Sequence, residues 1–198
     1  MEPMCGRPLV VGIGGTARPG STTERALRIA LEAAERDGAR TACFGGPFLA
    51  GLPAYMPHSP HRGADVLRLL EAVREADGIL LASPGYHGGV SGVVKNAFDF
   101  LEDLREDERP YLDGRAVGCI VTAFGWQSCT TTLNSMRSIV HALRGWPTPL
   151  GATLNTASGL FDDEGACTDA KAALQLQVVA RQVARFASAN MSSPVLTT

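Results

Sequence analysis

The sequence is poor in the features that mark nucleic-acid-binding, membrane and secreted proteins. Its 18 lysines and arginines are set against 20 aspartates and glutamates, for a formal charge of -2, whereas proteins that bind duplexes through bulk charge carry a basic surface. The first apolar stretch, residues 9–13, is short and contains Gly12, so it predicts neither a signal peptide nor a membrane span. We therefore expect a cytoplasmic protein that binds no nucleic acid and no membrane.

Residues for disulfide and metal chemistry are also scarce. The five cysteines are an odd number and none has C-x-x-C spacing, which disfavours both a disulfide framework and a thiolate metal site. His58 and His61 lie in a proline-rich stretch, without the helix or the carboxylate that a zinc site needs. The sequence predicts no metal centre, and its cysteines are interpreted as buried or incidental thiols.

What the sequence does contain is the pattern of one α/β domain. A chain of 198 residues, 45% of them hydrophobic, can bury a full core by itself. Short apolar runs predict five strands at 9–13, 40–44, 78–82, 116–122 and 149–154. Apolar residues at helical spacing predict five helices around 27–34, 66–73, 94–101, 133–143 and 172–186.

Alternating strands and helices build right-handed crossovers onto a parallel sheet. The sequence therefore predicts a flavodoxin-like doubly wound five-stranded parallel sheet with helices on both faces, in a single domain over residues 1–187. Residues 188–198 are expected to form a disordered tail. Ligands of such sheets bind beyond the carboxyl ends of the strands, which directs attention to three loops: 14–21, 83–90 and 123–130.

The first loop combines glycines, hydroxyls and Arg18 directly before a predicted helix. Free amides and the positive dipole end of a helix favour an anion at such a position. Ser21 and Glu24 also have the spacing of a capping box. One alternative is therefore that Ser21 only caps the helix, although capping explains neither Arg18 nor the other hydroxyls.

Two better-known phosphate motifs nearly fit the first loop. Residues 12–17 match the dinucleotide pattern G-x-G-x-x-A, but Pro19 delays the helix and no carboxylate follows the second strand to hold a ribose. Residues 15–22 match a Walker A motif, except that Ser21 replaces its lysine, which disfavours triphosphate hydrolysis. The loop is therefore predicted to hold one phosphomonoester, with Arg18 balancing its charge.

Two segments resemble motifs of the NAD(P)H-dependent FMN reductase family. The first loop is similar to the opening G-S-x-R-x-x-S, in which Gly15, Thr16, Arg18 and Ser21 match. The second loop and the helix after it are similar to P-E-Y-N-G followed by P-G-x-L-K-N-A-x-D-W, with eight matching positions: Pro84, Tyr86, Gly88, Gly92, Lys95, Asn96, Ala97 and Asp99. The resemblance covers nearly the whole chain apart from its tail.

This resemblance implies an FMN site with NADPH or NADH as co-substrate, in a homodimer or homotetramer. For the flavin phosphate it implies contacts from the first loop: Thr16, Arg18, Ser21, Thr22 and Thr23. For the flavin ring it implies contacts from the second and third loops: Pro84, Gly85, Tyr86, His87, Gly88, Ala123, Phe124, Gly125 and Trp126. No protein side chain is expected to act as a catalytic group, because the flavin carries the chemistry.

The sequence departs from the family pattern at three positions. Gly85 replaces the usual glutamate and is expected to allow close approach of the backbone to the ring, or a positive φ, while leaving room for a larger substrate. His87 replaces asparagine, and is either a titrating group near the flavin or a simple loop residue. Ser91 replaces proline and is expected to serve as an N-cap.

Other readings of these residues stay open. Tyr86 is alternatively an amphipathic residue at a helix entrance, and Trp126 a hydrophobic staple or a dimer contact. Lys95 and Asp99, four residues apart on a helix, are expected to pair with each other.

The resulting hypothesis is an NAD(P)H-dependent flavoprotein oxidoreductase. It would reduce flavin for a monooxygenase, or reduce a quinone, azo or similar small molecule. The alternatives are a flavodoxin-like electron carrier without turnover of its own, which the charge of -2 disfavours, and a scaffold that has lost its flavin. Cys119 and Cys129 are expected to be dispensable for electron transfer.

Overall fold

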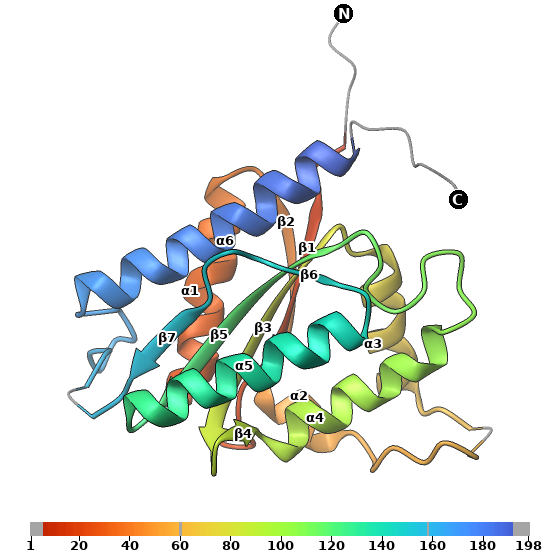
Figure 1. Cartoon of the computed structure of the whole chain (residues 1–198), viewed down its shortest axis with the longest axis horizontal. Coiled ribbons are helices and arrows are strands. Elements are labelled where there is room, and N and C mark those ends of the chain that lie inside the picture. Colours follow the sequence, from red (N-terminus) through yellow and green to blue (C-terminus); the bar gives the residue numbers. More distant parts are fainter. Residues whose placement is uncertain (1–5, 60, 158, 192–198) are drawn as a thin grey trace, which may run out of the picture.

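In the computed structural model, residues 6–59, 61–157 and 159–191 are described, and they form one twisted sheet between two layers of helices (Figure 1). Hydrogen bonding sets the strand order β2-β1-β3-β5-β6, with β7 also pairing with β5. These strands are parallel, and their bounds are β1 (Leu9–Gly14), β2 (Arg40–Phe44), β3 (Gly78–Tyr86), β5 (Ala116–Ala123), β6 (Trp146–Pro147) and β7 (Ala152–Asn155). The expected doubly wound parallel sheet is confirmed.

The helices cover both faces of the sheet. Figure 1 places α1 (Thr22–Arg36) and α6 (Ala170–Met191) on one face. The opposite face carries α3 (Ala64–Glu75), α4 (Gly92–Asp99) with the short helix η1 (Phe100–Leu104), and α5 (Trp126–Ala142). Among the described residues, no helix combines the length and the apolar character needed to cross a bilayer.

Each face of the sheet has its own hydrophobic core. Successive residues of a strand point to opposite faces, and Val10, Leu80 and Ile120 pack with α1 and α6. Their neighbours Val11 and Leu81 pack with the helices of the other face. Burial on both faces explains why these strands occur in the sequence as nearly continuous apolar runs.

Three parts of the chain differ from the sequence-based expectation. The predicted fifth strand, 149–154, is replaced by two short strands, β6 and β7, which pair with different parts of β5. A further helix, α2 (Gly46–Gly51), follows β2 and has a proline in its first turn. Helix α6 continues to Met191, so the expected tail over 188–198 is helical in its first four residues, and residues 192–198 lie outside the described part.

A fully buried arginine joins the amino-terminal end of β5 to the end of α3. Arg115 is 1% exposed and has no carboxylate partner among the described residues. Its Nε donates to the Ala76 carbonyl at 2.9 Å and its Nη2 to the Arg74 carbonyl at 2.9 Å, while Nη1 donates to the carbonyls of Tyr111 and Asp113. Burial lowers the pKa of Arg115 to about 10, and the four carbonyls compensate the buried charge.

We expect Arg115→Met to lower the free energy of unfolding by about 3 kcal/mol, because one buried and three partly buried carbonyls would lose a charged donor. Urea unfolding followed by circular dichroism measures this change. The control is Arg105→Met, since that arginine is exposed and pairs only with surface glutamates, and we expect a change within about 0.5 kcal/mol. Equal losses in the two variants would contradict the role of Arg115.

Candidate functional site at the carboxyl edge of the sheet

The carboxyl ends of β1, β3 and β5 meet at one edge of the sheet, which we call the carboxyl edge. Pairing of β3 with both β1 and β5 fixes this arrangement. The three loops that the sequence analysis selected leave the sheet here, low in the view of Figure 1. Open parallel sheets bind their ligands at this edge, so the structure brings the sequence-predicted residues to one place.

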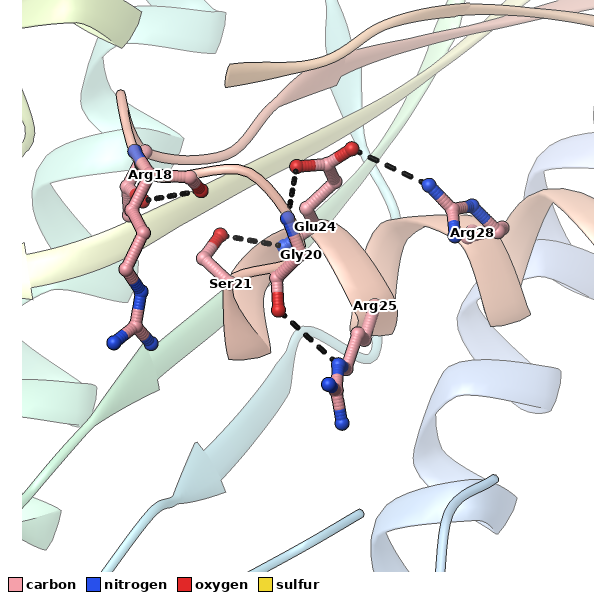
Figure 2. Close-up of polar contacts among 7 residues, drawn as sticks. Arg18, Gly20, Ser21, Glu24, Arg25 and Arg28 are labelled. Carbon is pink, nitrogen blue, oxygen red and sulfur yellow. Dashed lines mark hydrogen bonds and ion pairs between the residues drawn. The ribbon is translucent and has the colours of Figure 1, made fainter. Parts of the chain in front are cut away.

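In the first loop, 15–21, only the backbone of Arg18 has hydrogen-bond partners among the described residues. The Arg18 amide donates to the Thr16 hydroxyl at 3.2 Å, and that hydroxyl donates to the Arg18 carbonyl at 3.3 Å. Figure 2 shows the Arg18 guanidinium extending away from the other polar groups of the loop. Within the described ranges, no carboxylate or carbonyl pairs with this guanidinium, so its charge is available to an anion.

The start of α1 has the predicted capping box, with one difference. The Ser21 hydroxyl accepts a hydrogen bond from the Glu24 amide at 3.3 Å, as expected for an N-cap. The Glu24 carboxylate bonds back to the amide of Gly20 rather than that of Ser21, at 3.2 Å, and pairs with Arg28 at 3.3 Å (Figure 2). Because Arg28 neutralises Glu24, this carboxylate does not cancel the charge of Arg18.

The two threonines that open α1 differ in their surroundings. The Thr23 hydroxyl is buried and lies 2.6 Å from the Thr122 hydroxyl of β5. It therefore joins α1 to β5 at the carboxyl edge, and its contact with a phosphate stays a prediction. Thr22 is the first residue of the helix and is half-buried. The first amides of a helix have no intrahelical acceptor, so the amides of Thr22 and Thr23 face the loop as donors.

The second loop is a tight hairpin rather than an open loop over 83–90. Strand β3 continues to Tyr86 and pairs antiparallel with β4 (Gly89–Val90). The two residues between the strands have positive φ, 51° at His87 and 82° at Gly88, as a type I′ turn requires. Histidine tolerates this conformation better than most residues, so it can stand where the family has asparagine.

The Ser83 side chain stabilises this hairpin through two hydrogen bonds. Its buried hydroxyl accepts from the Ser91 amide at 2.9 Å and donates to the Pro84 carbonyl at 2.9 Å. Ser91 has the backbone position of an N-cap for α4, as expected, but it makes no side-chain capping bond. The buried Ser91 hydroxyl has no hydrogen-bond partner, so one polar group beside the hairpin is left for a ligand or water.

The structure contradicts two features expected of Gly85, a positive φ and room for a larger substrate, while close approach of its backbone to a ring stays a prediction. Its φ is not positive, and a Cβ here would lie 2.8 Å from the hydroxyls of Ser128 and Thr132 and 3.1 Å from the Ala123 Cβ. The space beyond Gly85 is therefore filled by the start of α5 and the end of β5, and leaves no room for a larger substrate. The Ser128 hydroxyl also donates to the Gly85 carbonyl at 3.3 Å, which ties the hairpin to α5.

The third loop is shorter than predicted and presents aromatic rings. Only Phe124 and Gly125 separate β5 from α5, because Trp126 is the first residue of the helix rather than a loop residue. Ala123 is buried at the end of β5. Phe124 is 79% exposed, Trp126 57% and Tyr86 53%. Three large exposed aromatic side chains at the end of β3, in the third loop and at the start of α5 are typical of a surface that receives a flat ligand.

The sequence analysis gave no role to Arg25, which the structure places at the first loop. Its Nε donates to the Gly20 carbonyl at 3.1 Å, and its Nη1 donates to the Asp162 carbonyl at 2.9 Å. Arg25 thereby ties the first loop to the segment between β7 and α6, and Figure 2 shows its bond to Gly20. Its position in the first turn of α1, beside a glycine-rich loop, was the available signal.

Two polar side chains of the motif helix α4 have partners within the protein. The Asn96 side chain accepts from the Tyr55 amide at 2.8 Å and donates to the Pro53 carbonyl at 2.9 Å, which anchors the segment after α2. Lys95 pairs with Asp99 at 2.6 Å, which confirms the expected ion pair. Neither pair is needed to explain ligand binding.

Two buried cysteines near the site are poor nucleophiles. Burial raises the pKa of Cys119 to about 12 and also raises the pKa of Cys129, so both stay protonated at neutral pH. The described residues contain no cluster of histidine, cysteine and acidic side chains that could hold a metal ion.

Comparison with known proteins gives one family. A family model described as NADPH-dependent FMN reductase matches residues 8–158. An NADPH azoreductase of Bacillus sp. strain OY1-2 is 31% identical over 88 residues, which are 44% of this chain and 46% of that protein. The FMN-dependent NADPH-azoreductase of Staphylococcus aureus USA300 is 28% identical over 120 residues, 60% of each protein. The chain thus aligns with only about half of the length of these relatives.

A solved structure has the same fold as this chain. FerB, a flavoenzyme NAD(P)H:(acceptor) oxidoreductase from Paracoccus denitrificans, superposes with a TM-score of 0.76 at 19% identity. The match covers 92% of this chain and 98% of that one. It confirms the flavodoxin-like architecture.

We expect Gly85→Ala to lower the free energy of unfolding by about 1–2 kcal/mol, because the added methyl group would displace two hydrogen-bonded hydroxyls. Gly92→Ala is the matched control, since nothing lies within 4 Å of a Cβ at that position and alanine favours a helix. Thermal unfolding of the two variants measures the difference. Equal stability of the two variants would contradict close packing of α5 against the hairpin.

Proposed function

The chain belongs to the NADPH-dependent FMN reductase family, and we propose that it is an oxidoreductase that binds FMN at the carboxyl edge and uses NADPH or NADH to reduce it. The observation that carries this proposal is a phosphate loop with an unpaired arginine on the same edge as a glycine hairpin and exposed aromatic rings. A phosphate and a flat ring are the two ends of FMN. The prediction made from the sequence motifs is thereby confirmed at the level of the family.

At the phosphate end, the residues fit a phosphomonoester through one side chain and the backbone. Arg18 supplies an unpaired positive charge, and the first amides of α1 supply donors at the positive end of the helix dipole. Thr16 contributes a hydroxyl within the same turn. Ser21 acts by fixing the start of the helix, and Thr23 by packing on Thr122, so both hold the loop in shape around the phosphate.

At the ring end, the hairpin offers backbone groups to the edge of the flavin ring, and the aromatic residues pack beside the ring. The backbone of Pro84, Gly85 and Gly88 is proposed to contact a ring edge, and Gly88, which has no side chain, allows close approach. Tyr86, Phe124 and Trp126 are exposed.

FMN supplies the redox chemistry, by taking up a hydride from the nicotinamide and releasing electrons to an acceptor. The protein residues bind and orient the two molecules and exclude water between them. No described residue is needed as a proton donor for hydride uptake, and His87 is fully in solvent. We therefore interpret His87 as a turn residue.

We propose a small organic electron acceptor, such as an azo or quinone-like compound, because two relatives are described as azoreductases. Release of reduced flavin to a monooxygenase is the second possibility. We also propose a cytoplasmic homodimer or homotetramer, as the family resemblance implies. Exposed aromatic residues at the carboxyl edge support a partner surface there.

Turnover measurements separate this proposal from an electron carrier. Oxidation of NADPH and NADH is followed with free FMN, with a quinone, with an azo dye and without acceptor, using the flavin-loaded protein. We expect oxidation with at least one acceptor. A carrier would bind flavin tightly and fail with all of them, and a scaffold without flavin would show no visible absorbance.

We expect Arg18→Ala to raise the Kd for FMN about tenfold or more while leaving the Kd for riboflavin within about twofold. Only FMN carries the dianion that Arg18 balances, and charge-assisted hydrogen bonds contribute about 1.5–3 kcal/mol. The measurement is a titration of flavin fluorescence quenching. Arg28→Ala is the control, because that arginine pairs with Glu24 on the same helix. Equal losses for both ligands would remove Arg18 from the phosphate site.

A further inference from the structure

A second possible ligand site, which we call the second cavity, lies beside the flavin loops. Of the proposed flavin contacts, only Trp126 lines it. Its volume is about 180 Å³, and it lies among the start of α5, the end of β7 and the start of α6. These three segments come together on the left of Figure 1. The polar and aromatic residues that line it are Trp126, Thr153, Asn155, Asp169, Lys171 and Gln175.

The size and position of the cavity limit what it can hold. Sites for drug-sized ligands usually span about 300–1,000 Å³, so this cavity suits a single ring system and not a whole cofactor. Trp126 lines the cavity and is also part of the third loop of the flavin site. A ligand that extends past Trp126 would therefore reach both places.

Two amide side chains are held with their nitrogens free. The Asn155 Oδ1 accepts from the Ala157 amide at 2.9 Å, and the Gln175 Oε1 accepts from the Thr153 amide at 3.0 Å. These bonds assign the oxygen of each side chain, which leaves both NH2 groups as donors. In the described part of the chain neither NH2 group has an acceptor. Two donors beside an indole suit a flat heterocycle with acceptor nitrogens.

The cavity is lined by one carboxylate and one ammonium, and these two groups differ in their contacts. The Asp169 Oδ1 accepts from the amides of Lys171 and Ala172 at 2.8 and 3.0 Å, so this carboxylate caps α6. The ammonium of Lys171 forms no ion pair within the described ranges. The only other lysine, Lys95, is paired with Asp99. Lys171 is thus available to a phosphate, with Asp169 as the opposing charge.

We propose that this cavity binds the adenine ring of NADPH, and that Lys171 beside it binds a phosphate of the same nucleotide half. The adenine stacks on Trp126 and accepts from Asn155 and Gln175, while Lys171 pairs with a phosphate group of the nucleotide. The nicotinamide half then extends past Trp126 to the flavin ring. This inference rests on the proposed function, because it takes NADPH as the electron donor.

Binding of the nucleotide half is measured without turnover. The probe is adenosine 2′,5′-bisphosphate, titrated into the flavin-loaded full chain that carries Trp146→Phe, so that Trp126 is the only tryptophan. We expect a saturable change in Trp126 fluorescence. In the same background, Lys171→Gln and Gln175→Leu should each raise the Kd about tenfold, the usual effect of losing a hydrogen bond to a charged group or a buried amide contact. The matched control Lys95→Gln should leave the Kd unchanged.

Three results would overturn the proposal: no saturable change, an equal change with inorganic phosphate alone, or an equal Kd in the Lys171 and Lys95 variants. A second measurement compares NADPH with reduced nicotinamide mononucleotide, which lacks the adenine half. Lys171→Gln should lower kcat/KM about tenfold for NADPH and leave it unchanged for the mononucleotide. Equal losses for both donors would also contradict the assignment.

Failure of the proposed function gives a different pattern. In that case the unmodified protein oxidises neither nicotinamide donor. The bisphosphate titration still tests the cavity, because it needs no turnover.

Discussion

The parallel hydrogen bonding of β3 between β1 and β5 is the constraint on which the rest of the molecule depends. It brings the carboxyl ends of three strands to one edge, so that residues from positions 16 to 126 share a single surface. Burial of both sheet faces holds these strands in register. Polar contacts then hold the loops of this edge in place. Ser83 bonds to Ser91 across the hairpin, and Ser128 bonds the hairpin to α5.

Much of this arrangement could be predicted from the sequence. Strands β1, β3 and β5 are nearly continuous apolar runs, and the capping pattern of Ser21 and Glu24 marks the start of α1. The two motif segments indicate the family and the loops that form the site. These features are local, since each depends on residues close together in the chain.

The features that sequence reasoning missed depend on distant contacts. The space beyond Gly85 is filled by side chains of α5, about 40 residues away in the chain. The two short strands that replace the expected fifth strand are defined only by pairing with β5. The second cavity needs three segments between positions 126 and 175, and no motif connects them. Asn155, a polar residue at the carboxyl end of β7, was the one available signal.

The central claim is that the carboxyl edge holds FMN and lets a nicotinamide donor reduce it. The most direct test is an anaerobic titration of the purified, flavin-loaded protein with NADPH, followed by the visible absorbance of the flavin. The account predicts about one FMN per chain and loss of that absorbance with about one equivalent of NADPH, because a hydride carries both electrons. Failure to retain FMN, or bound FMN that stays oxidised in excess NADPH and NADH, would contradict it.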